Sequence, residues 1–231
     1  MAIKVITFDL DNTLWDVTPA LLSAEEAQRQ WLEEHRPDTI NQLQPENIAS
    51  IRRQLLADEP ELRHNITGIR REFLRRLQRS AGYGETASAE GADQAFAVFL
   101  EVRQQVDLYD GVESMLADLA TRFTLGSLTN GNADVHKTPA GQHMSFAFLA
   151  EDVGGSKPHP ALFEAAMKET GAAGDEILHV GDNPEHDIMG AIRAGLRTVW
   201  INAGGDAYPL EDRPDLTLRH VTELPAALGS L

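Results

Sequence analysis

The sequence predicts an α/β protein in which a parallel sheet forms the core and an all-helical domain is inserted after the first strand. Two observations predict this fold class. Short apolar runs alternate with helical patterns over most of the chain, and one long stretch keeps helical periodicity without a convincing strand. A third observation concerns function, because acidic residues directly follow two of the apolar runs.

The core is predicted from four short runs rich in Val, Ile, Leu and Phe, at residues 3–8, 123–128, 177–180 and 197–201. Helical patterns lie between them at residues 112–119, 162–167 and 188–192, the last closed by a glycine suited to a helix C-terminus. Such apolar strands between helices indicate a parallel sheet covered on both faces. Ligands of these sheets bind beyond the carboxyl ends of the strands.

The inserted domain is predicted to span residues 17–105, which leaves 1–16 and 106–231 for the core. Ile66, Ile69, Phe73 and Leu77 recur at helical spacing, with arginines on the other faces. Residues 92–106 repeat this period, and residues 21–32 follow it more loosely. These patterns predict an all-helical insert.

The charge balance excludes some partners. The 231 residues include 36 acids and 20 bases, a formal charge of −16, which argues against nucleic acid or an anionic membrane as the main partner. No apolar run approaches the ~20 residues of a spanning helix, and the N-terminus resembles a strand rather than a signal peptide. The chain has no cysteine. Together these features favour a cytoplasmic location.

Asp9 and Asp11 leave the first predicted strand together and give the strongest functional signal. Acids after strands are often ordinary turn or cap residues, which is the alternative interpretation. Two carboxylates this close repel each other unless a cation lies beside them. Oxygen ligands from one or two carboxylates are what Mg²⁺ prefers, so the pair suggests Mg²⁺ as cofactor.

Three later motifs also follow predicted strands or open helices. Thr129 and Asn130 end the second strand and offer donors to an oxyanion, or form a plain turn. Lys157 precedes a helix; it either is solvated or offsets the repulsion between Asp9 and an incoming phosphate. Asp182 follows the third strand, and Asp187 lies where a helix cap would also explain it. All these groups are expected at one rim of the sheet.

These ordered motifs resemble those of the haloacid dehalogenase superfamily of phosphotransferases, and the likeness covers the whole chain. The resemblance implies a Rossmann-like core, a helical cap domain, Mg²⁺ dependence and an aspartyl-phosphate intermediate. By position, it implies that Asp9 is the nucleophile, and that Asp11 is the general acid/base and binds Mg²⁺ through its backbone carbonyl. It further implies that Thr129, with Asn130, binds a phosphoryl oxygen and that Lys157 balances charge. It also implies that Asp182 is a metal ligand and that Asp187 is either an alternate ligand or a residue that orients the ligands.

The acid at Asp11 bears on the type of reaction. The dehalogenases of the superfamily lack an acid at this position, because halide departure needs no proton. The sequence therefore favours a phosphatase acting on a small phosphorylated metabolite over an L-2-haloacid dehalogenase-type hydrolase. A phosphomutase or phosphotransferase, and a non-catalytic binding protein on the same fold, remain as alternatives.

Residues 58–70 resemble the caps of bacterial flavin mononucleotide phosphatases, which are associated with riboflavin biosynthesis. The resemblance suggests FMN or 5-amino-6-(5-phosphoribitylamino)uracil as substrate, with His64, Thr67 and Arg70 as candidate cap contacts. Trp15, near the hinge, either flanks an aromatic leaving group or packs within the hinge. The helical faces suggest that the chain is a monomer or a weak homodimer.

Overall fold

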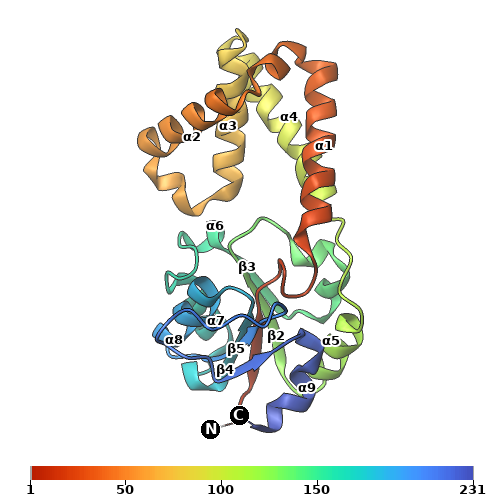
Figure 1. Cartoon of the computed structure of the whole chain (residues 1–231), viewed down its shortest axis with the longest axis vertical. Coiled ribbons are helices and arrows are strands. Elements are labelled where there is room, and N and C mark those ends of the chain that lie inside the picture. Colours follow the sequence, from red (N-terminus) through yellow and green to blue (C-terminus); the bar gives the residue numbers. More distant parts are fainter. Residues whose placement is uncertain (1, 231) are drawn as a thin grey trace. The chain divides into compact units, whose positions relative to one another are not determined.

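A computed structural model describes residues 2–230 of the chain, which divides into two compact units. The first unit combines residues 1–17 with 106–231 and is called the core unit. The second, Thr18–Gln105, is called the helical unit. All the strands lie in the core unit (Figure 1). The predicted division was at residues 16/17 and 105/106.

The core unit contains a six-stranded parallel sheet with the strand order β3-β2-β1-β4-β5-β6. The strands are β1 (Val5–Phe8), β2 (Thr124–Thr129), β3 (Phe146–Leu149), β4 (Ile177–Gly181), β5 (Arg197–Ile201) and β6 (Leu216–Leu218). The order reverses between β1 and β4, which are neighbours in the sheet but far apart in the sequence. A ligand site is expected where their carboxyl ends diverge.

Helices cover both faces of this sheet. Figure 1 shows α5 (Val112–Ala120) and α9 (Leu224–Ala227) on one side, and α7 (Ala161–Thr170) and α8 (Gly190–Arg193) on the other. A further short helix, α6 (Ala150–Val153), follows β3. Every residue of β1 and β4 is buried, as expected for central strands with both faces covered. The predicted parallel sheet with helices on both faces is therefore confirmed.

Two strands were not predicted from the sequence. β6 has only three residues, none of them buried, and gives no apolar run. β3 is as short as β1 but, unlike β1, has only one fully buried residue, and its apolar run was not singled out. The pairing of β3 with β2 depends on Gly126, because a Cβ atom there would lie 2.2 Å from the Phe146 ring. This close packing is a tertiary property, and the local sequence does not reveal it.

The predicted helix at residues 188–192 has a different form in the structure. The segment Pro184–Met189 is a π-helix, and only Gly190–Arg193 is α-helical. Asn183 caps the π-helix by accepting hydrogen bonds from the backbone N–H groups of Glu185 and His186 at 3.0 and 2.8 Å. This cap leaves the side chain of Asp187 available for other contacts.

The helical unit consists of α1 (Val17–His35, whose first residue belongs to the core unit), α2 (Pro45–Asp58), α3 (Ile66–Ser80) and α4 (Glu85–Arg103). Its described residues contain no strand, as predicted, but α2 was missed. The α1, α3 and α4 helices share a buried cluster that includes Leu32, Leu74 and Phe99. Among the described residues, no helix is long and apolar enough to span a lipid bilayer.

Candidate active site

The loop after β1 carries Asp9 and Asp11. The backbone N–H of Asp9 donates to the carbonyl of Val180 at 2.8 Å, which continues the pairing of β1 with β4 by one residue. The chain then turns sharply at Asn12, whose φ of 64° lies in the left-handed region that Asn tolerates better than most residues. The Asn12 N–H donates to the carbonyl of Trp15 at 2.7 Å and closes the loop. This turn fixes the backbone that carries both carboxylates.

Lys157 lies at the centre of the site and is only 2% exposed. Its Nζ donates to Asp9 Oδ1 at 2.7 Å and to the backbone carbonyl of Leu128 at 2.6 Å, and it lies 2.6 Å from Asp187 Oδ1. Burial works to lower the pKa of Lys157, but Asp187 and Asp9 outweigh burial and raise it above its ordinary value. The lysine is therefore a buried cation held between two carboxylates.

Asn130 supports Lys157 from the end of β2. Its side-chain NH₂ donates to the Lys157 carbonyl at 2.9 Å, and its side-chain oxygen accepts from the Lys157 N–H at 2.7 Å. The sequence suggested that Asn130 contacts a phosphoryl oxygen, whereas the structure engages its amide with the backbone of Lys157. Thr129 lies beside it, and its Oγ1 accepts from the N–H of Gly131 at 3.0 Å.

Asp187 is 1% exposed and belongs to a buried hydrogen-bond network. Besides Lys157, it accepts from the backbone N–H of Asn183 at 2.9 Å and contacts His179 Nε2 at 3.3 Å. Burial works to raise the pKa of Asp187, but Lys157 and His179 outweigh it and hold the pKa well below its ordinary value. Asp187 is thus an ionised group that holds its neighbours in place, while Asn183 performs the capping role.

Two residues that support Asp187 were not singled out from the sequence. Gly181 gives the carboxyl group room, because a Cβ atom there would lie 2.3 Å from its Cγ. His179 is fully buried in β4, and its other ring nitrogen lies 2.9 Å from Thr7 Oγ1. Burial lowers the pKa of His179. A histidine inside an otherwise apolar strand was the signal that could have identified it.

Asp182 follows β4 and is held through its backbone. The indole N–H of Trp200 donates to the Asp182 carbonyl at 2.8 Å, which leaves the carboxylate to face the site. Burial, together with the charges of Asp187 and Asp11, raises the pKa of Asp182 to about 6. Trp200 was predicted only as part of an apolar strand.

Trp15 is fully buried and contacts the other acid of the first loop. Its indole N–H donates to Asp11 Oδ1 at 2.9 Å. Of the two interpretations of Trp15, this geometry favours packing within the loop over stacking on a leaving group. The chain on both sides of it is held by backbone bridges, to Asp11 and to Leu108.

The carboxylates provide a donor set that fits a divalent cation. Oxygens of Asp9, Asp182 and Asp187 lie within 4.8 Å of one another. Burial raises the pKa of Asp9 well above its ordinary value despite the opposing effect of Lys157, and the charge of Asp187 adds to the rise. One lysine therefore does not balance this cluster, and a hard cation with oxygen ligands, such as Mg²⁺, would favour the ionised carboxylates. Asp11 contributes no carboxylate oxygen to the cluster.

These groups line a small pocket of about 190 Å³ in the core unit. Its lining residues come from four segments of the chain: Asp9, Asp11, Asn12, Thr129, Asn130, Gly131, Lys157, Asp182, Asn183, His186 and Asp187. The core residues predicted from the four motifs therefore lie together, and His186 and Asn183 join them. Arg70, His64 and Thr67 belong to the helical unit. Arg70 lines a separate pocket there.

Comparison with known proteins identifies the family. Residues 3–195 match the family model of haloacid dehalogenase-like hydrolases. The chain is 31% identical over 230 residues to the 5-amino-6-(5-phospho-D-ribitylamino)uracil phosphatase YigB of Escherichia coli, covering 99% of this chain and 96% of that protein. It is 29% identical to the human N-acylneuraminate-9-phosphatase, with 99% and 95% covered.

A solved structure is also similar along the whole chain. The crystal structure of a 2-haloacid dehalogenase from Pseudomonas syringae pv. tomato superposes with a TM-score of 0.94 at 40% identity, covering 98% of both chains. The core motifs, the strand order of the sheet and the matched family model all indicate the same family. The chain therefore belongs to the haloacid dehalogenase-like hydrolases, as its motifs predict, and it is an enzyme of their phosphatase type.

Proposed function

We propose that this enzyme hydrolyses the phosphomonoester of a small metabolite by two successive displacements at Asp9. The observation that carries the proposal is the contact between Lys157 Nζ and Asp9 Oδ1 at 2.7 Å, inside a pocket that also contains Asp11 and Thr129. A carboxylate nucleophile, a fixed cation beside it and an acid two residues away are the groups that phosphoester cleavage through a covalent intermediate needs.

In the first displacement, a carboxylate oxygen of Asp9 attacks phosphorus and forms an aspartyl phosphate. The bond from phosphorus to the ester oxygen breaks, and Asp11 donates its proton to the departing alkoxide. In the second displacement, Asp11 takes a proton from water as the water oxygen attacks phosphorus. Inorganic phosphate leaves and the Asp9 carboxylate is restored. Lys157 and the Thr129 hydroxyl neutralise and position the phosphoryl oxygens.

The proposed cofactor is Mg²⁺, held by Asp9, Asp182 and the backbone carbonyl of Asp11, with Asp187 as an alternate ligand or an orienting residue. When bound, it would supply positive charge against the phosphoryl oxygens. The carboxylate oxygens grouped within 4.8 Å support this assignment. The contacts of Asp187 with Lys157, His179 and the Asn183 N–H favour the orienting role.

For the substrate, we propose 5-amino-6-(5-phosphoribitylamino)uracil or FMN, which would place the enzyme in riboflavin biosynthesis. Two observations support this choice. The similarity to YigB, named as a phosphatase of the first compound, extends over 99% of the chain. Residues 58–70, with His64, Thr67 and Arg70, resemble the corresponding segment of flavin mononucleotide phosphatases. We expect these three side chains to contact the substrate.

Dehalogenation is the second candidate reaction, favoured by the 40% identity to the 2-haloacid dehalogenase of Pseudomonas syringae. Asp11 weighs against it, since a departing halide needs no proton donor. The indole hydrogen bond to Asp11 suggests that the orientation of this acid matters. Transfer of the phosphoryl group to a second carbon substrate is a further alternative that the same assays address.

The deciding experiment measures catalytic efficiency on a panel of compounds. It comprises FMN, 5-amino-6-(5-phosphoribitylamino)uracil, sugar phosphates, nucleoside monophosphates, p-nitrophenyl phosphate and L-2-chloropropionate. We expect release of inorganic phosphate from the phosphomonoesters, with the two flavin-pathway compounds preferred, and no release of chloride. Chloride release without phosphate release would assign the chain to dehalogenation, and a phosphorylated acceptor would identify a transferase. No turnover of any compound would contradict the proposed substrates.

The chemistry of Asp9 is tested by replacing it with asparagine, which is similar in size but a poor nucleophile. We expect Asp9→Asn to lower turnover by about 10³-fold or more, in line with the loss of other catalytic nucleophiles. Chelation with EDTA should abolish hydrolysis, and added Mg²⁺ should restore it. Unchanged turnover in the variant would reject Asp9 as the nucleophile, whereas unchanged turnover in EDTA would reject the metal.

A further inference from the structure

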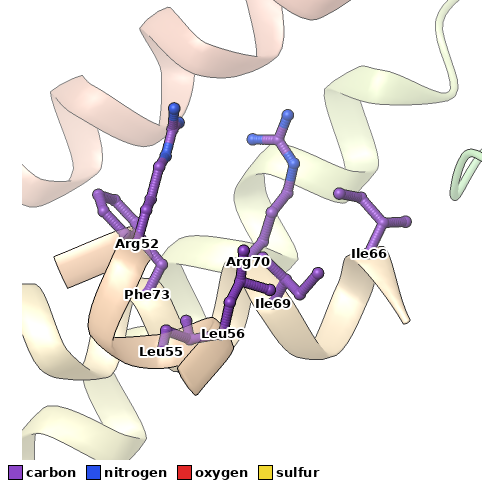
Figure 2. Close-up of a pocket in the computed structure, with 7 residues that line it drawn as sticks. All are labelled: Arg52, Leu55, Leu56, Ile66, Ile69, Arg70 and Phe73. Atoms are coloured by element: carbon purple, nitrogen blue, oxygen red, sulfur yellow. The ribbon is translucent and has the colours of Figure 1, made fainter. Parts of the chain in front are cut away.

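A second pocket lies within the helical unit, between α2 and α3. Its volume is about 210 Å³. Figure 2 shows the side chains that line it, five of them apolar and two of them arginines. Because all seven residues belong to the helical unit, this pocket is separate from the one that contains Asp9.

The apolar part of the pocket is left partly open to solvent. Leu56 is 49% exposed, and among the described residues only Leu22, at 62%, is another strongly exposed large hydrophobic side chain. Ile66 and Ile69 are half-buried at the start of α3. Apolar surface that the fold leaves exposed in a concave site is typical of a binding site rather than of packing.

Each of the two arginines packs its guanidinium group against an aromatic ring. The guanidinium of Arg70 lies 4.1 Å from the centroid of the Phe99 ring, and that of Arg52 lies 5.5 Å from the centroid of the Phe73 ring. Figure 2 shows both arginine side chains extending in the same direction from the two helices, with apolar side chains near their bases. Stacking of this kind orients a guanidinium while its N–H groups can still bind an anion.

The charge on these arginines is poorly balanced compared with that on the rest of α3. Arg71 pairs with Asp93, and Arg76 pairs with acids from α2 and α3. Arg70 makes a longer ion pair, with Glu25 at 3.9 Å. Burial lowers the pKa of Arg70; the charge of Glu25 opposes this, and the positive charges of Arg52 and Arg103 add to the lowering. The pocket is therefore electropositive within a chain of net charge −16.

We propose that this pocket binds a small organic anion with a flat apolar ring, such as an aromatic carboxylate. The ring would occupy the surface formed by Leu56, Ile66 and Ile69, and the anionic group would bind the guanidinium groups of Arg52 and Arg70. Charge complementarity favours this occupant over a neutral apolar segment or a second copy of the chain. The proposal requires no catalysis at Asp9, and it assigns Arg70, a candidate substrate contact of the proposed function, to this second ligand instead.

The experiment measures binding of 2-naphthoate to the full chain by isothermal titration calorimetry, with neutral 2-naphthalenemethanol as the matched compound. We expect one site per chain and at least about tenfold weaker binding of the neutral compound, because a charge-assisted contact is lost. Arg70→Gln and Arg52→Gln should weaken naphthoate binding by a similar factor. Arg53→Gln, an exposed neighbour on α2 outside the pocket, should leave it unchanged.

A second pair of variants tests the apolar surface without disturbing the core. Leu56→Glu places a negative charge in the pocket and should abolish naphthoate binding, whereas Leu22→Glu, at the other exposed leucine, should not. Equal binding of the two naphthalene compounds, or full binding by both Arg70→Gln and Leu56→Glu, would overturn the proposal. Dimerisation of the unliganded chain that Leu56→Glu abolishes would assign the groove to a second copy instead.

The same titration with Asp9→Asn separates this proposal from the proposed function. Naphthoate should bind that variant as it binds the parent chain, because the pocket lies entirely in the helical unit. Loss of phosphatase activity with retained binding is the expected result. Binding that disappears with Asp9→Asn, while the fold measured by circular dichroism is unchanged, would place the naphthoate site at Asp9 and contradict the pocket assignment.

Discussion

Lys157 illustrates how a buried charge is retained at this site. Its ammonium group has two carboxylates and one backbone carbonyl within 2.7 Å, which satisfies all three of its N–H donors. A buried cation without such partners would be strongly disfavoured. The contact with Asp9 also fixes the carboxylate of the proposed nucleophile, so we expect the lysine to contribute both to folding and to the proposed reaction.

Replacing this lysine should therefore affect stability and activity together. We expect Lys157→Gln to lower kcat/KM for an aryl phosphate by about 10²–10³-fold, as when one donor to a developing negative charge is removed. We expect it to destabilise the fold by about 3–5 kcal/mol, because Asp187 would remain buried without its cation. Urea unfolding and steady-state kinetics measure the two effects. Lys168→Gln, at an exposed position of α7, is the control and should change neither.

Trp15 provides a sharper test of the role of Asp11. Trp15→Phe keeps an aromatic ring in the buried position but removes the N–H that donates to Asp11 at 2.9 Å. Loss of one hydrogen bond, about 0.5–1.5 kcal/mol, corresponds to a fall in rate of up to roughly tenfold. We expect kcat for an alkyl phosphate to fall by this factor and kcat for p-nitrophenyl phosphate to fall less, since nitrophenolate needs little protonation to leave.

The comparison between leaving groups distinguishes orientation of the acid from general damage to the site. A fall by the same factor for both substrates would contradict a specific effect on Asp11. The matched control is Trp31→Phe, which alters a half-buried tryptophan of α1 in the helical unit. It should leave the ratio of the two kcat values unchanged.

Among the helices and strands, those with a clear hydrophobic pattern in their own residues were predicted best from the sequence. The strands β1, β2, β4 and β5 were all predicted, because each is a buried apolar run. The edge strand β6 has three residues with partly exposed side chains, and therefore lacks that signal. For α2, the spacing of Ile48, Ile51 and Leu55 was present in the sequence, but its many polar residues obscured it.

The sequence predicted which residues lie together at the candidate site, but it did not predict the contacts between them. Asp9, Asp182 and Lys157 follow strands or open helices, and parallel strands bring such positions to one rim. The engagement of Asn130 with the backbone of Lys157 joins residues 27 positions apart, and the support of Asp187 by Gly181 depends on the π-helix. These contacts depend on tertiary geometry, which neither propensity nor spacing encodes.

The packing of the Phe146 ring of β3 over Gly126 of β2 gives a prediction for stability. A Cβ at Gly126 would lie 2.2 Å from the Phe146 ring, so Gly126→Ala must displace β3 or the ring. We expect a destabilisation of about 1–3 kcal/mol, the usual cost of overpacking a core. Urea unfolding followed by circular dichroism measures it. Gly84→Ala is the control, because nothing lies within 4 Å of a Cβ there. Equal stability of both variants would contradict this packing.

For the whole molecule, the net negative charge is unevenly distributed between the segment that contains the helical unit and the rest of the chain. Between Asp16 and Arg103 there are fifteen acids and eleven bases, so the remaining segments carry −12 of the total −16. The four acids predicted at the site account for a minority of that −12. Most of the charge is therefore surface charge, and it attracts any cation without specificity.

Because most of the charge lies on the surface, stabilisation by Mg²⁺ bound at the carboxylate cluster must be distinguished from stabilisation by screening of surface charge. A ligand that binds only the folded state stabilises it by about 2.7 kcal/mol at a concentration 100 times its Kd, whereas screening of surface charge depends on ionic strength alone. We therefore expect Mg²⁺ to raise the thermal midpoint of the chain more than NaCl of equal ionic strength does. The excess should disappear in Asp182→Asn and persist in Asp118→Asn, which alters an exposed acid on α5. If Mg²⁺ and NaCl shift the midpoint equally in the parent chain, the carboxylates of Asp9, Asp182 and Asp187 do not form a metal site, whatever activity the enzyme shows.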